Sequence, residues 1–360
     1  MDGELPRDGN GRNATKRPAR ERPAMSELGK VDRAFFDEVI YPHLGADRDD
    51  VVLGPTHGVD FGVLDVGDRA VVVATDPISI LPELGFARAG RLALDIVLAD
   101  VAVSGVPPTH LAVSLSLPPE MTDEEFATTW RAMSDYAAAL DVAIAAGHTA
   151  RYSGIEYSWV GAGTALGVGD RDAVVRPDGA RAGDAIVIST GPAAEIAGLF
   201  ATLFPGELDL PAETLAIARE RVADIEVVED ALAVHAAAEI TAMHDATEGG
   251  IQGGLVEMAR GAGVRFDVDR DRVPRAPGVT EVCDAVGVDP WRVSSAGSLL
   301  VTVPEDDAEA VVGALEARGT AAAVAGTASE GEGVYFDGER VAHPDVDPAW
   351  AAYAALAGQE

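Results

Sequence analysis

Apolar and polar positions follow two patterns in the first half of the chain. Alternating positions and short apolar runs predict strands over 61–65, 70–75, 111–117 and 157–167. Apolar residues spaced three and four apart predict helices over 31–40, 88–104 and 122–140. Strands and helices therefore mix within this half, as they do in an α+β unit.

The second half repeats this mixture. It predicts strands over 185–189, 264–268 and 298–303, and helices over 193–203, 212–236 and 306–317. Between the halves, residues 176–183 are rich in Gly, Pro and charge, as a linker is. We therefore predict a two-domain α+β or α/β protein in which a similar unit occurs twice.

The length supports two domains, because 360 residues exceed the usual size of a single core. Residues 1–24 are polar and lack an apolar period, which predicts a disordered N-terminal extension, with Met25 as an alternative start. We predict an N-terminal domain over 25–170 and a C-terminal domain over 178–345. A C-terminal helix or tail is expected over 346–360.

The charge balance is strongly acidic. The formal net charge is −33, and only Lys16 and Lys30 are lysines among 27 basic residues. Such a surface is typical of a halophilic protein, whose self-repulsion is screened by salt. It argues against nucleic acid as a partner, because basic side chains supply most of that affinity. An acidic mimic of DNA is the less favoured alternative, since the charge is spread along the chain.

Composition also bears on location and on metal chemistry. Hydrophobic residues make up 48% of the chain, yet no apolar run approaches the roughly 20 residues of a membrane span. No secretory signal opens the chain, so we expect a cytoplasmic protein. Cys283 is the only cysteine, which excludes an internal disulfide and multi-cysteine metal sites. A metal would be held by oxygen or imidazole.

Residues 244–254, HDATEGGIQGG, combine a carboxylate, a hydroxyl and four glycines. Ile251, Leu255 and Met258 then recur at helical spacing, so Gly249 and Gly250 lie at a helix start. Free N–H groups and the helix dipole favour an anion at such a place, which makes the glycines candidates for binding phosphate. A tight turn capped by Asp245 or Thr247 explains the same pattern.

Three acids stand at apolar positions. Asp60 precedes a predicted strand, Asp76 ends the run VVVATD, and Asp100 falls on the inward stripe of the 88–104 helix. Asp95 should face solvent, about 140° round the helix from Asp100. A buried carboxylate costs several kcal/mol unless it is paired or binds metal. A helix cap or an arginine salt bridge is the alternative for each acid.

Hard oxygen ligands beside a glycine-lined helix start suit Mg²⁺ and a polyphosphate. Gly147, His148 and Thr149, just before a predicted strand, add donors for phosphate or an imidazole for metal. A lone histidine is more often structural. Neither a P-loop nor a G-x-G-x-x-G pattern occurs in the chain.

In this order, these motifs resemble the AIR synthase superfamily, whose members include HypE, selenophosphate synthetase and thiamine-monophosphate kinase. The resemblance spans about 28–304 and is closest to HypE and its archaeal relatives. It is carried by Gly29-Lys30, GVDFGV, VVVATDPI, LADVAVSGVPP, AGHT, PDGARAGDAIVIST, HDATEGGIQGGLVEMA and VSSAGSLLVTV.

The resemblance implies an N-terminal domain that forms a β-barrel with a second copy, and a C-terminal α/β domain. ATP would lie in the cleft of this homodimer, with Mg²⁺ held by Asp60, Asp76 and Asp100 and with Lys30 on the phosphates. Asp245 is the implied acid/base or orienting group, and His148 is the other candidate catalytic residue. The family's common step is ATP-dependent activation of an oxygen or selenium nucleophile, often an amide oxygen.

Two positions depart from the family. Position 148 usually carries Asp or Glu, although selenophosphate synthetases also have His-Thr there. HypE ends in a cysteine that receives the carbamoyl group, whereas this chain ends in AGQE. We therefore expect an ATP-dependent enzyme acting on a small molecule. A nucleotide-binding dimer that acts as a regulator or maturation partner is the alternative, and a purely structural role predicts no nucleotide affinity.

Overall fold

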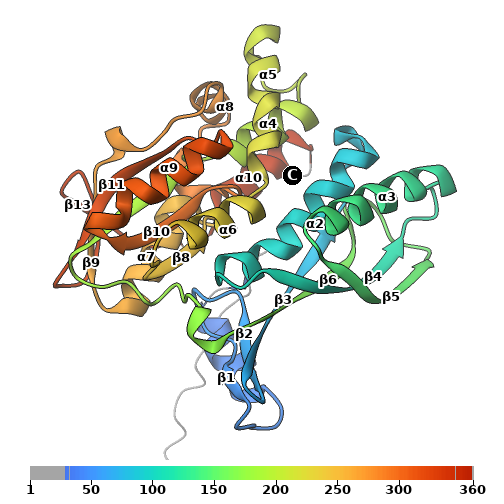
Figure 1. Ribbon diagram of the computed structural model, residues 1–360. Helices are drawn as coiled ribbons and strands as arrows, with labels where there is room; N and C mark the ends of the chain where they lie inside the picture. Colours follow the sequence, from blue (N-terminus) through green and yellow to red (C-terminus); the bar gives the residue numbers. More distant parts are fainter. Residues whose placement is uncertain (1–28, 32, 345, 359–360) are drawn as a thin grey trace, which may run out of the picture.

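The computed structural model describes residues 29–31, 33–344 and 346–358, and contains two β-sheets with helices packed on them (Figure 1). The predicted two-domain α+β architecture is confirmed. The expected disorder of residues 1–24 lies outside the described residues. In the part of the chain that is described, no helix is long and apolar enough to cross a membrane.

The first sheet has six strands in the order β1-β2-β3-β6-β4-β5. Neighbouring strands are antiparallel except for β4 and β5, which are parallel. A two-residue loop, Gly67-Asp68, joins β2 to β3, as its sequence predicts. The strands are β1 Val51–Leu53, β2 Gly62–Val66, β3 Arg69–Ser79, β4 Pro108–Leu117, β5 Ala143–Arg151 and β6 Trp159–Gly169.

Two long helices, α2 (Phe86–Val103) and α3 (Asp123–Ala139), cover one face of this sheet (Figure 1). The apolar stripe of α2 packs on β3 and β6, and α3 packs on α2. The predicted capping box begins α3, because the Glu125 N–H donates to Thr122 Oγ1 at 3.2 Å and the Thr122 N–H to Glu125 Oε2 at 2.7 Å.

The segment predicted as a helix over 31–40 is short. It contains α1 (Arg33–Phe35) and a π-helical turn, Phe36–Ile40. Val39 in this turn is 42% exposed. The helix is too short to pack a full apolar stripe against the sheet.

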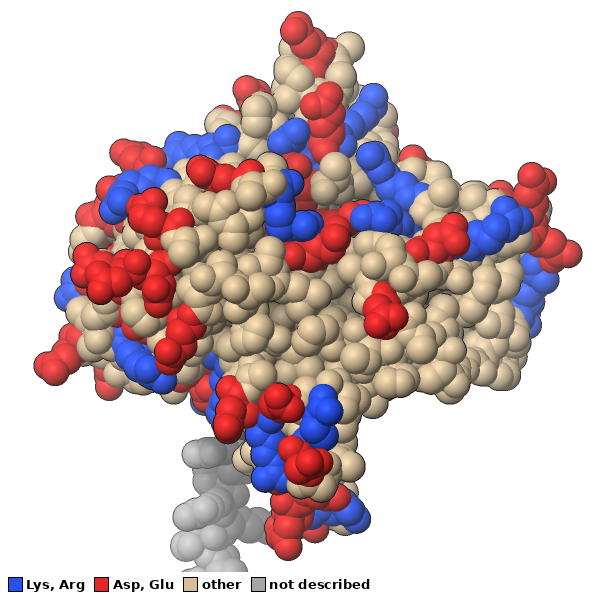
Figure 2. Space-filling model, viewed as in Figure 1, with Lys and Arg blue, Asp and Glu red and all other residues tan. Residues whose placement is uncertain are grey.

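Among the described residues, no helix covers the other face of the first sheet. The strand register shows which side chains lie on this face, because alternate residues of a strand point to opposite faces. Those on the open face of the central strands include Val71, Val73, Thr75, Pro77, His110, Ala112, Ser114, Ala162, Thr164, Leu166 and Val168. None of these residues is Asp, Glu, Lys or Arg, and charges are sparse over this part of the surface in Figure 2.

The second sheet has seven strands in the order β13-β12-β9-β11-β7-β10-β8. All neighbours are antiparallel except β12 and β9. Strand β7 is buried at every position, which explains its continuous apolar run. The strands are β7 Asp184–Ser189, β8 Ala242–Asp245, β9 Arg265–Val268, β10 Leu299–Pro304, β11 Ala322–Ser329, β12 Gly333–Phe336 and β13 Glu339–Val341.

The helices of the second half pack around this sheet. They are α4 Ala194–Leu203, α5 Ala212–Arg219, α6 Val228–Ala237, α7 Gly250–Ala262, α8 Val279–Val286, α9 Ala308–Arg318 and α10 Pro348–Leu356. The single helix predicted over 212–236 is wrong, because a 3₁₀ turn, Glu220–Ile225, separates α5 from α6. This turn buries Val222 and Ile225, so tertiary packing outweighs the helical pattern there.

Asp95 connects the two domains. The expectation that it faces solvent is wrong: its side chain is fully buried, because α3 and α6 cover that side of α2. Its carboxyl group accepts hydrogen bonds from the Tyr136 hydroxyl and from the N–H groups of Val227, at 2.7 Å, and Val228, at 3.4 Å. A carboxyl group of the first domain thus caps the start of α6 in the second.

Candidate functional site

Four of the predicted acids line one cavity between the domains, of about 400 Å³. Asp60 lies in the loop before β2, and Asp100 lies on α2 with 6% of its surface exposed. Asp245 is the last residue of β8. Asp76 lies within β3 opposite Gly163, on the face that α2 covers, rather than at a strand end as predicted. The fold therefore brings these acids together from four segments.

The neighbouring carboxyl groups destabilise one another's charged forms. Asp76 and Asp100 are within hydrogen-bonding reach. Burial raises the pKa of Asp100 well above its usual value, and the charges of Asp245 and Asp76 raise it further. Burial also raises the pKa of Asp76. Neighbouring buried carboxyl groups of this kind need a proton or a cation to neutralise them.

Lys30 lies against the same acids. Its Nζ is 3.6 Å from Asp60 Oδ1 and 3.4 Å from Thr247 Oγ1. Its backbone N–H donates to Glu248 Oε2 at 2.9 Å, which fixes this segment on the loop between β8 and α7. The Asp60 carboxylate, with further acids, raises the pKa of Lys30 above its usual value, so its side chain stays an ammonium.

A divalent cation fits this group of residues. Asp245 is buried, and within the described ranges its Oδ1 atom has no hydrogen-bond partner. A buried carboxylate oxygen without a partner is costly, and a metal ion would satisfy it. Carboxylate oxygens are also the ligands that Mg²⁺ prefers. The chemistry of these donors therefore agrees with the predicted metal.

The start of α7 also shows a packing reason for its glycines. Gly249 and Gly250 have φ values of +84° and +65°, and the Gly249 N–H donates to Asp347 Oδ2 at 3.0 Å. A Cβ at position 250 would lie 2.5 Å from the Val293 carbonyl oxygen. Close packing therefore requires Gly250, and Asp347 takes the capping position expected for Asp245 or Thr247.

His148 lies apart from the acids within one chain. Gly147, His148 and Thr149 belong to the edge strand β5, whereas a position just before a strand was predicted. The register pairs His148 with Ser114, on the open face of the sheet, while Asp76 faces α2. The His148 Nε2 atom instead lies 3.2 Å from the hydroxyl of Tyr152.

Sequence reasoning missed a histidine group behind Asp245. The ring of His244 places Nδ1 3.5 Å from Asp245 Oδ1 and Nε2 3.4 Å from Glu257 Oε2. His343 Nε2 lies 3.4 Å from the other oxygen of Glu257. Burial alone would lower the pKa of His244, but Asp245 and Glu257 together raise it to about 10. The sequence signal was a histidine inside a buried strand, next to a candidate catalytic acid.

The far end of the cavity is apolar. There α2 and the segment before it face α4 and the turn before α6, so the cavity extends along the contact between the domains. Trp350 and Tyr353 of α10 also line it, and the Tyr353 ring packs at 5.3 Å against Phe204, next to α4. The apolar lining includes Leu84, Leu92, Ile96, Ile196, Leu199, Leu203 and Ile225. A ligand with charged and apolar parts therefore suits this cavity.

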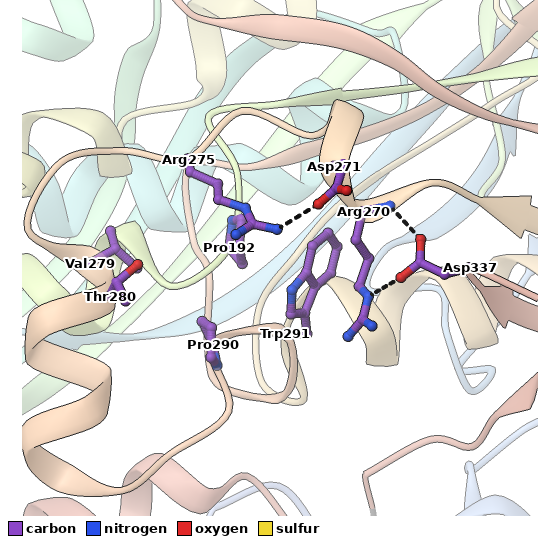
Figure 3. A pocket seen from close by; sticks show the side chains of 9 residues that line it. All are labelled: Pro192, Arg270, Asp271, Arg275, Val279, Thr280, Pro290, Trp291 and Asp337. Atoms are coloured by element: carbon purple, nitrogen blue, oxygen red, sulfur yellow. Dashed lines mark hydrogen bonds and ion pairs between the residues drawn. The ribbon is translucent and has the colours of Figure 1, made fainter. Parts of the chain in front are cut away.

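Another pocket lies on the C-terminal domain (Figure 3). Its arginines are paired with acids: Arg270 Nε lies 2.6 Å from Asp337 Oδ2, and an Arg275 nitrogen lies 3.4 Å from Asp271 Oδ1. Trp291 completes its wall. It shares no lining residue with the cavity of the acids, and its paired charges leave less to attract an anion.

Two family models match the chain, one in each half. The AIR synthase related protein N-terminal domain matches residues 58–168, and the AIR synthase related protein C-terminal domain matches residues 181–338. Each match contains most of one of the two sheets.

Sequence relatives include hydrogenase maturation proteins. A hydrogenase expression/formation protein of Methanocaldococcus jannaschii is 28% identical over 289 residues, which are 78% of this chain and 82% of the relative. The carbamoyl dehydratase HypE of Rhizobium leguminosarum is 29% identical over 281 residues, which are 72% of this chain and 73% of the relative.

Solved HypE structures share the fold. The E. coli protein aligns with a TM-score of 0.66 and 25% identity, over 77% of this chain and 87% of that one. A HypE in complex with ATP aligns with a TM-score of 0.57 and 22% identity, over 82% and 83% of the two chains. HypE from a HypE–HypF complex aligns with a TM-score of 0.63 and 20% identity, over 78% and 93%. The predicted resemblance and fold are thus confirmed, and the chain belongs to the AIR synthase related protein family.

Proposed function

We propose that this protein is a cytoplasmic, ATP- and Mg²⁺-dependent enzyme similar to HypE. It would activate the oxygen of a carbamoyl group, an amide or another small molecule by phosphoryl transfer. The observation that carries the proposal is that the buried carboxyl groups of Asp100 and Asp245 and the half-buried one of Asp76 meet Lys30 in one cavity. Membership of a family in which HypE has been solved with ATP supports it.

Asp60, Asp76 and Asp100 are proposed to hold Mg²⁺, which would bridge phosphate oxygens and offset their charge. The mutual repulsion of these acids favours a bound cation over the metal-free state. Lys30 would orient the phosphates as a point charge, since Asp60 keeps its pKa high. Gly249 and Gly250 would let the phosphates approach the backbone, with Asp347 moving from the Gly249 N–H.

Asp245 is proposed as the acid/base or orienting group of the reaction. It lines the cavity, and interaction with His244 lowers its pKa although burial alone would raise it. A deprotonated carboxylate at this position can accept a proton from an attacking amide or hydroxyl group. It can also hold that group by a hydrogen bond while its oxygen approaches the phosphate.

We also propose a homodimer, built on the open face of the first sheet. A face made mainly of Val, Leu, Ala, Thr and Ser side chains is unusual on a chain with a net charge of −33, and a second copy would bury it. The edge strand β5 carries Gly147, His148 and Thr149 on this side of the domain. In a dimer these residues could reach the cavity of the second copy, which is the catalytic role proposed for His148.

The acceptor is proposed to be a separate small molecule. The thiol of Cys283 is 1% exposed, and burial raises its pKa to about 12, so it does not suit nucleophilic chemistry. A protein partner is proposed as well, because a HypE–HypF complex is among the solved structures that share this fold.

The second candidate is a dimer that binds nucleotide without turnover and acts as a regulator or maturation partner. The capped start of α7 favours it, because Asp347 occupies the N–H group of Gly249 that phosphate would need. ATP binding without phosphate release on any carbamoylated or amide substrate would support this candidate over the enzyme.

Calorimetry of ATP with Mg²⁺ in multimolar KCl tests the proposal. We expect micromolar binding by the wild type and at least roughly tenfold weaker binding by Asp100→Asn, because the metal loses a ligand. Asp135→Asn on the exposed side of α3 removes the same charge and should bind normally. Wild-type protein that binds no ATP would exclude both the enzyme and the binding dimer.

A further inference from the structure

His244 lies between two carboxylates in the wall behind the cavity. Its side chain is 3% exposed, with Nδ1 facing Asp245 and Nε2 facing Glu257. Asp245 Oδ1, the atom nearest to Nδ1, is buried and has no hydrogen-bond partner in the described part of the chain. Ligand atoms of His244, Asp245 and Asp60 all lie within 4.8 Å of one another.

The His244 Nδ1 and Asp245 Oδ1 atoms are farther apart than the atoms of most hydrogen bonds. His244 Nδ1 and Asp245 Oδ1 are 3.5 Å apart, whereas N–H···O bonds are usually about 2.7–3.2 Å long. Two ligand atoms that each lie about 2.1 Å from one metal ion, at a tetrahedral angle, are separated by roughly 3.4 Å. The observed separation therefore also fits two ligands on a common ion.

We propose that His244 Nδ1, Asp245 Oδ1 and a carboxylate oxygen of Asp60 bind a divalent transition-metal ion such as Mn²⁺ or Zn²⁺. A small rotation of the half-buried Asp60 carboxylate would bring all three atoms to the ion. Imidazole with carboxylate suits transition metals, whereas Mg²⁺ prefers oxygen alone. The site lies beside the proposed magnesium site, and Asp60 would be shared between them.

Glu257 would orient the histidine. A histidine that binds metal through one nitrogen usually donates its other N–H to a carboxylate, and Glu257 Oε2 lies 3.4 Å from Nε2. His343 holds the second oxygen of Glu257 at 3.4 Å, which fixes the carboxylate from behind. This metal site is additional to the proposed ATP site. If it is present, Asp245 orients the reacting groups rather than acting as the acid/base.

Mn²⁺ alone is the probe. The full chain is freed of metal with a chelator, titrated with Mn²⁺ in multimolar KCl without nucleotide, and examined by electron paramagnetic resonance. We expect bound Mn²⁺ with nitrogen hyperfine coupling that persists in excess Mg²⁺. Because no nucleotide is present, the result is separate from that of the ATP experiment.

Two variants and a control test whether the nitrogen that couples to Mn²⁺ belongs to His244. His244→Gln should abolish the coupling, and Glu257→Gln should weaken Mn²⁺ binding roughly 10–100-fold. His43→Gln, at an exposed position in the turn Tyr41–His43, should change neither. Wild-type protein that binds Mn²⁺ without nitrogen coupling, or binds none, overturns the proposal. In that case His244 is protonated and paired with both carboxylates. The wild-type measurement alone decides this, so the test does not depend on whether the variants fold.

Discussion

Asp95 lies at the contact between the two domains, and its carboxyl group is fully buried. Burial raises its pKa from 3.8 to about 7, although Tyr136 and the N–H groups at the start of α6 favour the charged form. The protonated form is thus favoured in the folded state compared with the unfolded one. Its contribution to stability is present below pH 4 and is lost as the pH rises through 7.

Asp95→Asn should therefore change the pH dependence of stability. Relative to this variant, the wild type should lose up to about 4 kcal/mol of unfolding free energy between pH 4 and pH 8. Denaturant unfolding of both proteins at fixed high salt measures the difference. Asp135→Asn is the control and should run parallel to the wild type. Parallel curves for Asp95→Asn would contradict the assignment.

Cys283 gives a second prediction for a single residue. Its thiol is 1% exposed in a cluster with Val279 and Val282 of α8, and burial raises its pKa to about 12. A thiol reagent at pH 8 should label the folded protein only as fast as it unfolds, because the thiolate is the reactive form. Labelling that follows the denaturant transition agrees with this, whereas immediate labelling of the native protein disagrees.

The individual residues of the candidate site could be predicted from the sequence, but which of them lie together in the fold could not. Asp60, Asp76 and Asp100 stand out in sequence because a carboxyl group at an apolar position needs a partner. His148 stands out equally, yet the strand register turns it to the opposite face from Asp76. Register depends on which strands are neighbours, and local sequence does not contain that information.

At the scale of elements, helix α7 has glycines of two kinds. Gly250 begins it with φ +65° and with the carbonyl oxygens of Trp291 and Val293 within 2.8 Å of a Cβ. Gly263 ends it with φ +68°, and a Cβ there would meet no described atom within 4 Å. The two positions share a backbone conformation and differ in packing.

Alanine at these positions should separate the two costs. Gly263→Ala should destabilise by about 1–2 kcal/mol, the cost of a left-handed conformation. Gly250→Ala should lose more than about 3 kcal/mol, because backbone atoms must also move away from the new Cβ. Thermal or denaturant unfolding of both variants gives the comparison. Equal losses would mean that conformation alone, and no close packing, requires glycine at the start of α7.

Elements with strong local signals could be predicted, and the others could not. The hairpin at Gly67-Asp68 and the capping box of α3 follow from local chemistry. Strand β5 (Ala143–Arg151) was missed, because alanine and glycine have low strand propensity and only its pairing with β4 makes it a strand. The break before α6 was missed because a residue of the other domain, Asp95, caps that helix.

At the scale of the molecule, domain contact and metal chemistry meet in one cavity. The first domain supplies Asp60, Asp76 and Asp100, whereas Asp245, Thr247 and Glu248 come from the second. On another side of the contact, Arg91 and Glu226 join the domains through two hydrogen bonds of 2.7 Å. A fixed domain arrangement is therefore part of the site, because metal and phosphate ligands must hold one geometry.

The net charge of −33 gives the last prediction. Sixty Asp and Glu residues face 27 Lys and Arg residues, so the folded state carries self-repulsion that unfolding relieves. The screening length falls from about 10 Å at 0.1 M salt to about 3 Å at 1 M. The melting temperature should therefore rise steeply with KCl up to about 1 M, where screening between surface charges is nearly complete. CsCl at equal ionic strength should give the same rise if screening is the cause, whereas a rise specific to K⁺ would indicate bound potassium instead.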